Sequence, residues 1–322
     1  MEKNVRLRLL YIMEALFEKT DEDHGLTMQD ILSWLELHNL AGERKSIYED
    51  LRALKEYGLE IEYCREDKTY RLPERAMELS EMKLLVDAIH ASRFITQKRT
   101  NEMLRHVMNM ASCHQRAMLK RDTYAEKPKA QSAEGFYSLD RLHEAIRHNR
   151  QITFSYAVWN LDKKLERKHE GKRYQVSPWL MIWAEENYYL VAYDEEKNTF
   201  KHFRVDKILD AEVLDIPRKG EEEFRRLDSN RYTTNHFGMF HGEQTRVTLL
   251  CDNSLIGVML DRFGTDIQVI RENEEQFKIV VSVVVSPQFF AWIFGFGNQV
   301  KILTESVVAQ MKEQLEKTAS LY

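Results

Sequence analysis

The chain has 322 residues, a net charge of −5 and 43% hydrophobic residues. This length suits two or three domains, and the hydrophobic fraction is enough for globular cores. No run of about 18 apolar residues occurs, which excludes a transmembrane span. The N-terminal segment lacks the continuous apolar region of a signal peptide, so we expect a cytoplasmic protein. Cys64, Cys113 and Cys251 form no CxxC pair, which argues against a zinc or redox motif.

The charge is segregated along the chain. Residues 1–72 hold 11 Lys and Arg against 16 Asp and Glu, whereas residues 95–129 hold 8 against 3. An acidic N-terminal part disfavours contact with nucleic acid over its whole surface. DNA binding there would depend on a local cluster of cations.

The first 73 residues predict three helices and a β-hairpin. The expected elements are a first helix that ends at the break 21–25, helices at 28–37 and 43–57, and strands at 60–65 and 69–72. Thr27 provides an N-cap for the second helix, and Gly58 stands where a glycine ends the third. Pro73 ends the hairpin. Because this is the order of a winged helix-turn-helix, we assign residues 1–73 to such a DNA-binding domain.

The third helix carries the best candidates for a DNA contact. With Ile47, Leu51 and Leu54 in the core, positions 45, 49, 52 and 56 face outward at about 100° per residue. In a helix-turn-helix the N-terminal residues of the second motif helix reach the bases, and Arg or Lys reads guanine edges or holds phosphates. The candidate DNA-binding residues are Arg44, Lys45, Ser46, Tyr48 and Arg52.

Residues 74–135 predict a helical connector and a linker. Two helices are expected between residues 80 and 122, and the polar stretch 127–135 is typical of a linker. The Met- and Leu-rich face from Met82 to Ala111 favours a homodimer, because most helix-turn-helix regulators bind two half-sites as a two-fold pair.

The rest of the chain predicts a small β-barrel followed by an α+β extension. A helix at about 139–149 precedes strands expected at 152–156, 173–182, 188–193, 199–205 and 208–214. Five short strands in so few residues suggest a barrel, which we place at 136–218. After the polar stretch 217–242, the order strand-helix-strand-strand-helix-strand is that of a ferredoxin-like unit, placed at 219–322.

Several segments, taken in order, resemble one family of bacterial transcription regulators. Residues 43–54 (ERKSIYEDLRAL) resemble the recognition helix of DeoR-like regulators, which often carry a WYL domain. Four further segments resemble successive strands of the WYL domain: 152–156 (ITFSY), 176–180 (VSPWL), 188–190 (YYL) and 203–208 (FRVDKI). Residues 292–298 and 300–303 (VKIL) resemble the family's C-terminal extension. Glu49, Tyr188 and Lys207 depart from the common Arg, Trp and Arg of the family.

The resemblance implies an Sm-like WYL barrel that binds an anionic effector, in some members nucleic acid. Cations on or beside one strand, with flat tyrosine rings, suit a nucleotide or single-stranded nucleic acid. The candidate effector-binding residues are Ser155, Tyr156, Tyr189, Lys201, His202, Arg204 and Lys207. Because Asp206 lies between two of the cations, a surface strand with ordinary salt bridges is the alternative.

Catalytic patterns fail on their spacing. His143 and His148 are five residues apart, about 140° around a helix, so they cannot share a metal as in HExxH. Gly295-Phe296-Gly297 lacks the third glycine of a dinucleotide loop, and no GxSxG or Walker sequence occurs. We therefore expect no enzyme activity, no metal and no cofactor.

The fold class expected is a multidomain α+β protein, and the function expected is effector-controlled binding of double-stranded DNA. The alternative is a protein-interaction scaffold with a winged helix that does not bind DNA, which the acidic N-terminal part favours. An enzyme with a sensory N-terminus is a third hypothesis.

Overall fold

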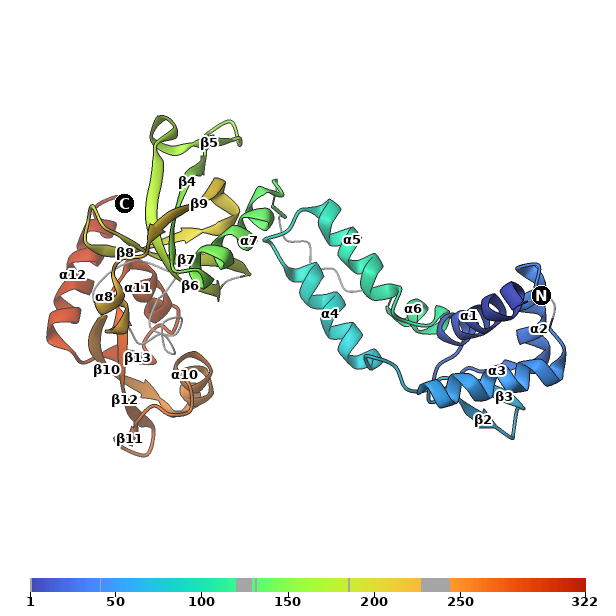
Figure 1. Ribbon diagram of the computed structural model, residues 1–322. Helices are drawn as coiled ribbons and strands as arrows, with labels where there is room; N and C mark the ends of the chain where they lie inside the picture. Colours follow the sequence, from blue (N-terminus) through green and yellow to red (C-terminus); the bar gives the residue numbers. More distant parts are fainter. Residues whose placement is uncertain (1, 41, 120–128, 131, 185, 227–243) are drawn as a thin grey trace. The chain divides into compact units, whose positions relative to one another are not determined.

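The computed structural model describes residues 2–40, 42–119, 129–130, 132–184, 186–226 and 244–322. The chain divides into two compact units, unit 1 (Met1–Gln131) and unit 2 (Ser132–Tyr322). Both units combine helices with antiparallel sheets (Figure 1). Over the described ranges, no helix has the length and apolar character that a membrane crossing requires.

Unit 1 begins with three helices and a small antiparallel sheet. Its elements are α1 (Glu2–Lys19), β1 (Leu26–Thr27), α2 (Met28–Leu37), α3 (Arg44–Tyr57), β2 (Glu62–Cys64) and β3 (Thr69–Arg71). The sheet order is β1-β3-β2. The helices share one core that includes Ile12, Ile31 and Ile47. The helices and the hairpin lie where the sequence predicts them, whereas the two-residue β1 was not predicted.

Local signals fix the ends of α2 and α3. The Thr27 hydroxyl accepts the Asp30 N–H at 3.2 Å, and the Asp30 carboxylate accepts the Thr27 N–H at 2.8 Å. Gly58 ends α3 with φ 111°, a left-handed conformation that favours glycine. Within α3, Asp50 is buried and pairs with Arg8 of α1 at 2.5 Å. This pair joins α3 to α1. Together with the buried Ile47, Leu51 and Leu54, it determines which side of α3 faces solvent.

The described residues 74–119 hold three helices rather than the two that the sequence predicts: α4 (Leu79–Ala91), α5 (Gln97–Met108) and α6 (Cys113–Leu119). The Ser112 hydroxyl accepts the Gln115 N–H at 3.0 Å and so caps α6. This capping serine was the local signal for the additional helix.

The apolar face expected to form a dimer is largely used inside unit 1. The residues of this face that are buried in the single chain are Met82, Val86, Ile89, Leu104 and Ala111. Leu84 and Leu85 of α4 remain 70% and 38% exposed. The buried side chains cannot contact a second copy, so a dimer through this face would use exposed residues such as Leu84 and Leu85, and the homodimer stays a prediction.

Unit 2 opens with α7 (Glu134–Arg147) and a six-stranded antiparallel sheet. The strands are β4 (Arg150–Trp159), β5 (Leu165–Arg167), β6 (Arg173–Ala184), β7 (Asn187–Asp194), β8 (Thr199–Arg204) and β9 (Ile208–Pro217). The order is β5-β4-β6-β7-β8, with β9 also paired to β4. Ile152 of β4 is registered with Val176 of β6 and with Val213 of β9. Strand β4 therefore lies between β6 and β9, and its end extends to β5.

Three features of this part were not predicted. Strand β5 and the short helix α8 (Glu221–Arg225) lie in stretches that read as polar turns. Gly135 belongs to α7 and not to a linker, because α7 begins at Glu134. A Cβ at Gly135 would lie 2.6 Å from the Asp206 Cα, so the glycine allows α7 to approach the turn after β8.

Positions 127, 128 and 131 of the expected linker, and 227–243, lie outside the described residues.

The C-terminal part of unit 2 forms a second sheet with its own core. Its elements are β10 (Gln244–Asp252), α10 (Ile256–Phe263), β11 (Val269–Arg271), β12 (Gln276–Val284), α11 (Pro287–Phe294), β13 (Val300–Ile302) and α12 (Glu305–Ala319). The sheet order is β11-β12-β10-β13. Val247, Ile279 and Phe289 lie in the core. The Ser286 hydroxyl accepts the Phe289 N–H at 3.2 Å, and Pro287 follows as the first helical residue.

Gly135→Ala should lower the free energy of unfolding by about 1–3 kcal/mol, because the added methyl overlaps the Asp206 backbone. Gly257→Ala in α10 is the matched control, since its Cβ meets nothing within 4 Å; its stability should be equal or slightly higher. Urea denaturation followed by circular dichroism measures both. Equal stability of the two variants would contradict the close approach of α7.

Candidate functional site

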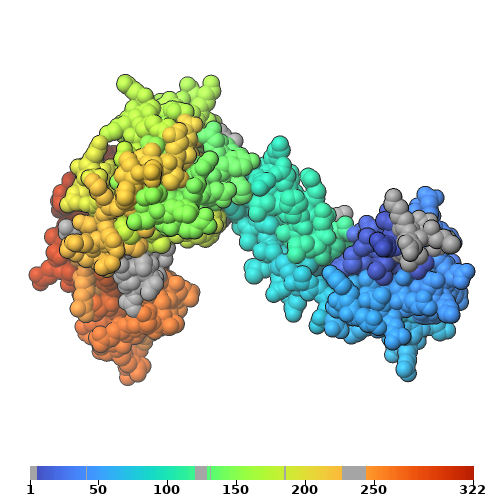
Figure 2. Space-filling view, viewed as in Figure 1, coloured from blue at the N-terminus to red at the C-terminus, as the bar shows by residue number. Residues whose placement is uncertain are grey.

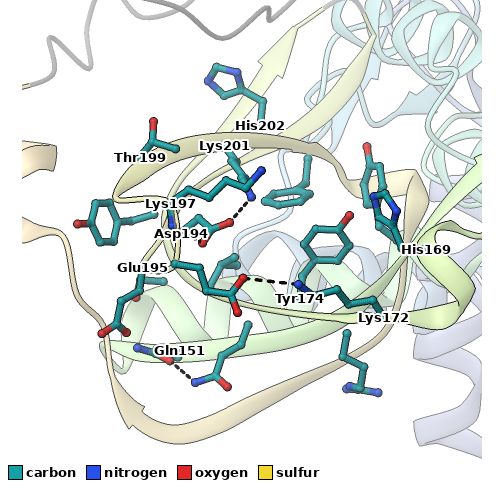
Figure 3. Close-up of a pocket in the computed structure, with 18 of the residues that line it drawn as sticks. Gln151, His169, Lys172, Tyr174, Asp194, Glu195, Lys197, Thr199, Lys201 and His202 are labelled. Carbon is teal, nitrogen blue, oxygen red and sulfur yellow. Dashed lines mark hydrogen bonds and ion pairs between the residues drawn. The ribbon is translucent and has the colours of Figure 1, made fainter.

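A cleft of about 1120 Å³ opens in unit 2. Its lining comes from β4, from the stretch that leads from β5 into β6, and from the β7–β8 hairpin (Figure 3). The lysine, arginine, histidine and carboxylate side chains among its lining are Lys168, His169, Lys172, Arg173, Asp194, Glu195, Glu196, Lys197, Lys201 and His202. Lysine and arginine outnumber carboxylates by five to three, so the cleft is suited to an anion.

The cations of the cleft differ in how far they are neutralised. Lys201 forms an ion pair with the buried Asp194, and Lys172 lies 3.5 Å from Glu196. Burial raises the pKa of Asp194, but the Lys201 ammonium outweighs it and the pKa is lowered. In the part of the chain that the structure describes, Lys168 and Lys197 make no ion pair. These two ammonium groups are therefore the cations most available to a ligand.

Aromatic rings line the same cleft. Phe203 makes edge-to-face contacts with Tyr174 and Tyr156, at centroid distances of 5.4 and 5.5 Å. The Tyr156 hydroxyl accepts the backbone N–H of Arg204 at 3.1 Å. Burial raises the pKa of Tyr156 to about 12, so the phenol stays neutral at physiological pH. Flat rings beside cations are the combination that binds a base and its phosphate.

The structure brings together only part of the predicted effector site. Tyr156, Lys201 and His202 line the cleft, but Ser155, Tyr189, Arg204 and Lys207 do not. Ser155 is fully buried and accepts a hydrogen bond from Arg167 at 3.3 Å, and Tyr189 is 7% exposed. Burial, and then the nearby Arg204, lower the pKa of Lys207.

Arg204 is engaged inside the protein. Its guanidinium donates to both carboxylate oxygens of Asp206, at 3.0 and 2.8 Å, and to the Asn187 side-chain oxygen at 2.9 Å. Burial lowers the pKa of Arg204, but the Asp206 carboxylate outweighs it and the pKa is raised. The residue thus ties β8 to the turn before β9 and to the start of β7.

Several cleft residues were missed by the sequence analysis. These residues are Lys168, His169, Lys172, Arg173, Tyr174 and Lys197. Residues 167–173 read RKHEGKR, a run of four Lys and Arg with one His in seven positions. This basic run was the signal that could have located the cleft.

The predicted DNA-binding residues lie at the surface of unit 1. Arg44 and Lys45 are exposed and Ser46 is half-buried at the start of α3. Tyr48 is 54% exposed, and burial together with Tyr48 raises the pKa of Tyr70 in β3 to about 12. The candidate face of α3 therefore continues onto the hairpin.

One candidate on α3 is partly neutralised. Arg52 pairs with Glu56 at 3.2 Å, and both side chains are mostly exposed. Such an exposed pair is weak, so Arg52 can leave Glu56 and bind a DNA phosphate with little loss of free energy.

Comparison with known proteins identifies one domain. Residues 138–213 match the WYL domain, which confirms the family prediction for this part of the chain. No significant match is found among curated proteins. A solved structure, proteasome accessory factor B/C (PafBC) of Arthrobacter aurescens, is 15% identical with a TM-score of 0.29, over 98% of this chain and 48% of that chain. The chain thus spans about half the length of PafBC, and at this TM-score the likeness does not establish a common fold.

Arg204→Ala should lower the free energy of unfolding by about 1–3 kcal/mol, because the half-buried Asp206 and the buried Asn187 each lose the hydrogen bonds that Arg204 donates. The matched control is Arg141→Ala. Arg141 is 60% exposed and forms a single surface ion pair with Glu144 at 3.4 Å, so its removal should change the free energy of unfolding by nearly zero. Chemical denaturation compares the two. If the Arg204→Ala variant is as stable as the control but binds single-stranded DNA or a cyclic nucleotide more weakly, Arg204 contacts the ligand instead of stabilising the fold.

Proposed function

We propose that this protein is a bacterial DNA-binding transcription regulator whose WYL domain binds an anionic effector that modulates DNA binding. The observation that carries the proposal is the WYL match at residues 138–213. The resemblance of the α3 sequence to DeoR-like recognition helices supplies the DNA-binding half. We further propose a cytoplasmic, homodimeric protein without enzyme activity.

The element orders support the finer domain assignment. Residues 1–73 have the helices and hairpin expected of a winged helix-turn-helix. The helices α4, α5 and α6, between Leu79 and Leu119, are proposed to form the helical connector. Residues 136–218 have a helix followed by an antiparallel sheet whose last strand β9 returns to β4, as an Sm-like barrel requires. For 219–322, the order β11-β12-β10-β13 with its two crossover helices supports a ferredoxin-like extension.

DNA is proposed to meet the N-terminal end of α3. Arg44, Lys45 and Ser46 lie there, and the first turn of α3 carries no acidic residue. The exposed Glu49 and Glu56 support the alternative, a winged helix that binds a protein partner. The two hypotheses differ in their response to salt, because each phosphate contact releases counterions from DNA.

The effector is proposed to occupy the cleft of unit 2. Its volume of about 1120 Å³ slightly exceeds the usual range of about 300–1,000 Å³ for small-ligand sites, which suits a nucleotide or a short single strand. Lys168 and Lys197 would hold phosphates, while Tyr156 and Tyr174 would offer rings to the bases. A regulatory effect requires the effector to bind one DNA-binding state better than the other.

Lys45→Ala should weaken binding to duplex DNA and reduce the salt slope by about one unit, since one phosphate contact is lost. Lys312→Ala, the same charge change on the exposed α12, should leave both unchanged. Fluorescence anisotropy against genomic operator fragments, selected by sequencing the DNA that the full-length protein retains, measures the two quantities. Identical binding by the two variants would remove α3 from the DNA interface.

The double variant Lys168→Ala/Lys197→Ala should bind a ten-nucleotide single-stranded DNA or a cyclic nucleotide about tenfold more weakly, because two phosphate contacts are lost. Lys163→Ala/Lys164→Ala in the β4–β5 turn removes the same charge outside the cleft and should bind normally. Titration calorimetry with both probes provides the measurement. An equal loss in both double variants would indicate only a general effect of charge.

A further inference from the structure

Helix α1 leaves an apolar face uncovered on unit 1. Leu7, Leu10 and Phe17 are 41%, 53% and 40% exposed, whereas Ile12 and Leu16 on the opposite side are fully buried. Spacings of three and seven residues place the three exposed side chains along one side of the helix. The dark-blue atoms of α1 reach the surface in Figure 2. These three side chains form an apolar strip to which another apolar surface can bind.

Two opposite charges flank the apolar face at equal distances. Arg6 and Glu14 are exposed, and each lies four residues from Leu10. Eight residues of helix separate them by about 12 Å, so they cannot pair with each other in one chain. Among the described residues, neither forms an ion pair. The face therefore carries a cation at one end, an anion at the other and leucine at its centre.

We propose that this face binds a second copy of the chain, with the two α1 helices antiparallel and a two-fold axis at Leu10. In that arrangement Leu10 meets Leu10 of the second copy, and Arg6 of each copy faces Glu14 of the other. A two-fold interface must be complementary to itself. An antiparallel helix with opposite charges placed symmetrically about an apolar centre meets this condition, whereas a parallel pair would place like charges together.

A hollow lies beside the same face, near the position that Arg6 of the second copy would reach. A cavity of about 370 Å³ lies next to α1 and is lined by Glu14, Phe17, Glu18, Arg75 and Met110, among others. Arg75 donates to the Thr20 carbonyl, and Glu18 is paired with Arg116. Glu14 is the lining carboxylate without an ion pair in the described chain, so it is the one available to Arg6 of the second copy.

The inference rests on the proposed function only because two DNA half-sites call for a two-fold pair. The experiment contains no DNA, so a failed interface and a failed DNA-binding assignment give different results. Sedimentation equilibrium of the full-length protein is expected to show a monomer–dimer equilibrium. Leu10→Arg places two cations at the axis and should raise the dissociation constant at least about tenfold. Leu84→Arg, on the exposed part of α4, is the matched control and should leave it unchanged.

Charge reversal tests the antiparallel register. Arg6→Glu or Glu14→Arg alone should each raise the dissociation constant several-fold, because like charges then face one another. An equimolar mixture of these two variants should form a heterodimer about as stable as the wild-type dimer, since every facing pair is again opposite. A protein that remains monomeric, a Leu10→Arg variant that dimerises normally, or a mixture without recovery would overturn the proposal.

Discussion

The two hydrogen bonds from Arg204 to Asp206 fix the turn at which β8 passes into β9, and the architecture around the cleft depends on that turn. The same guanidinium reaches Asn187 at the start of β7, and the Arg204 backbone N–H reaches Tyr156 on β4. Gly135 allows α7 to pack against the backbone of the turn. The segment 204–206 thus sets the positions of α7 and of the strands β4, β7 and β9. It also holds Tyr156, one of the aromatic residues of the cleft, in place.

In unit 1 the corresponding constraint is the shared core of the first three helices. Once Ile12, Ile31 and Ile47 are buried together, the remaining faces of α1 and α3 are determined. The outward face of α3 is polar and mixed in charge, whereas that of α1 is apolar at its centre. The two helices therefore offer surfaces of different chemistry from one rigid core, and this difference supports distinct partners for them.

Local signals made most of the elements predictable from the sequence. Thr27 and Gly58 act through neighbours within four residues, so the start of α2 and the end of α3 could be placed without knowledge of the fold. The helix α6 was missed although Ser112 caps it, because its seven residues are too few to show a clear apolar period. The sequence places Gly135 in a linker, because the close approach of Gly135 to Asp206 joins positions far apart in sequence and leaves no local signal.

The candidate cleft was harder to predict than the strands that form it. Lys168 and Lys197 approach the same space only after β6 and β7 pair, and no periodicity in the sequence encodes that approach. Arg204 matched the family signature, yet Asp206 two residues later occupies its guanidinium. Sequence pattern identified the domain, which the WYL match confirms, whereas the availability of each cation depended on its neighbours in space.

The buried pair between Arg8 and Asp50 has a mechanical consequence. It links the helix proposed to meet a second copy with the helix proposed to meet DNA, at 2.5 Å and with both side chains at most 13% exposed. Separating such a pair would leave a charge in a poorly solvated site, so α1 and α3 should move together as one rigid body. In a dimer paired through α1, the crossing angle of the two α1 helices at Leu10 would then determine the distance between the two α3 helices. A small change of that angle would change the spacing of the DNA half-sites that the dimer can bind.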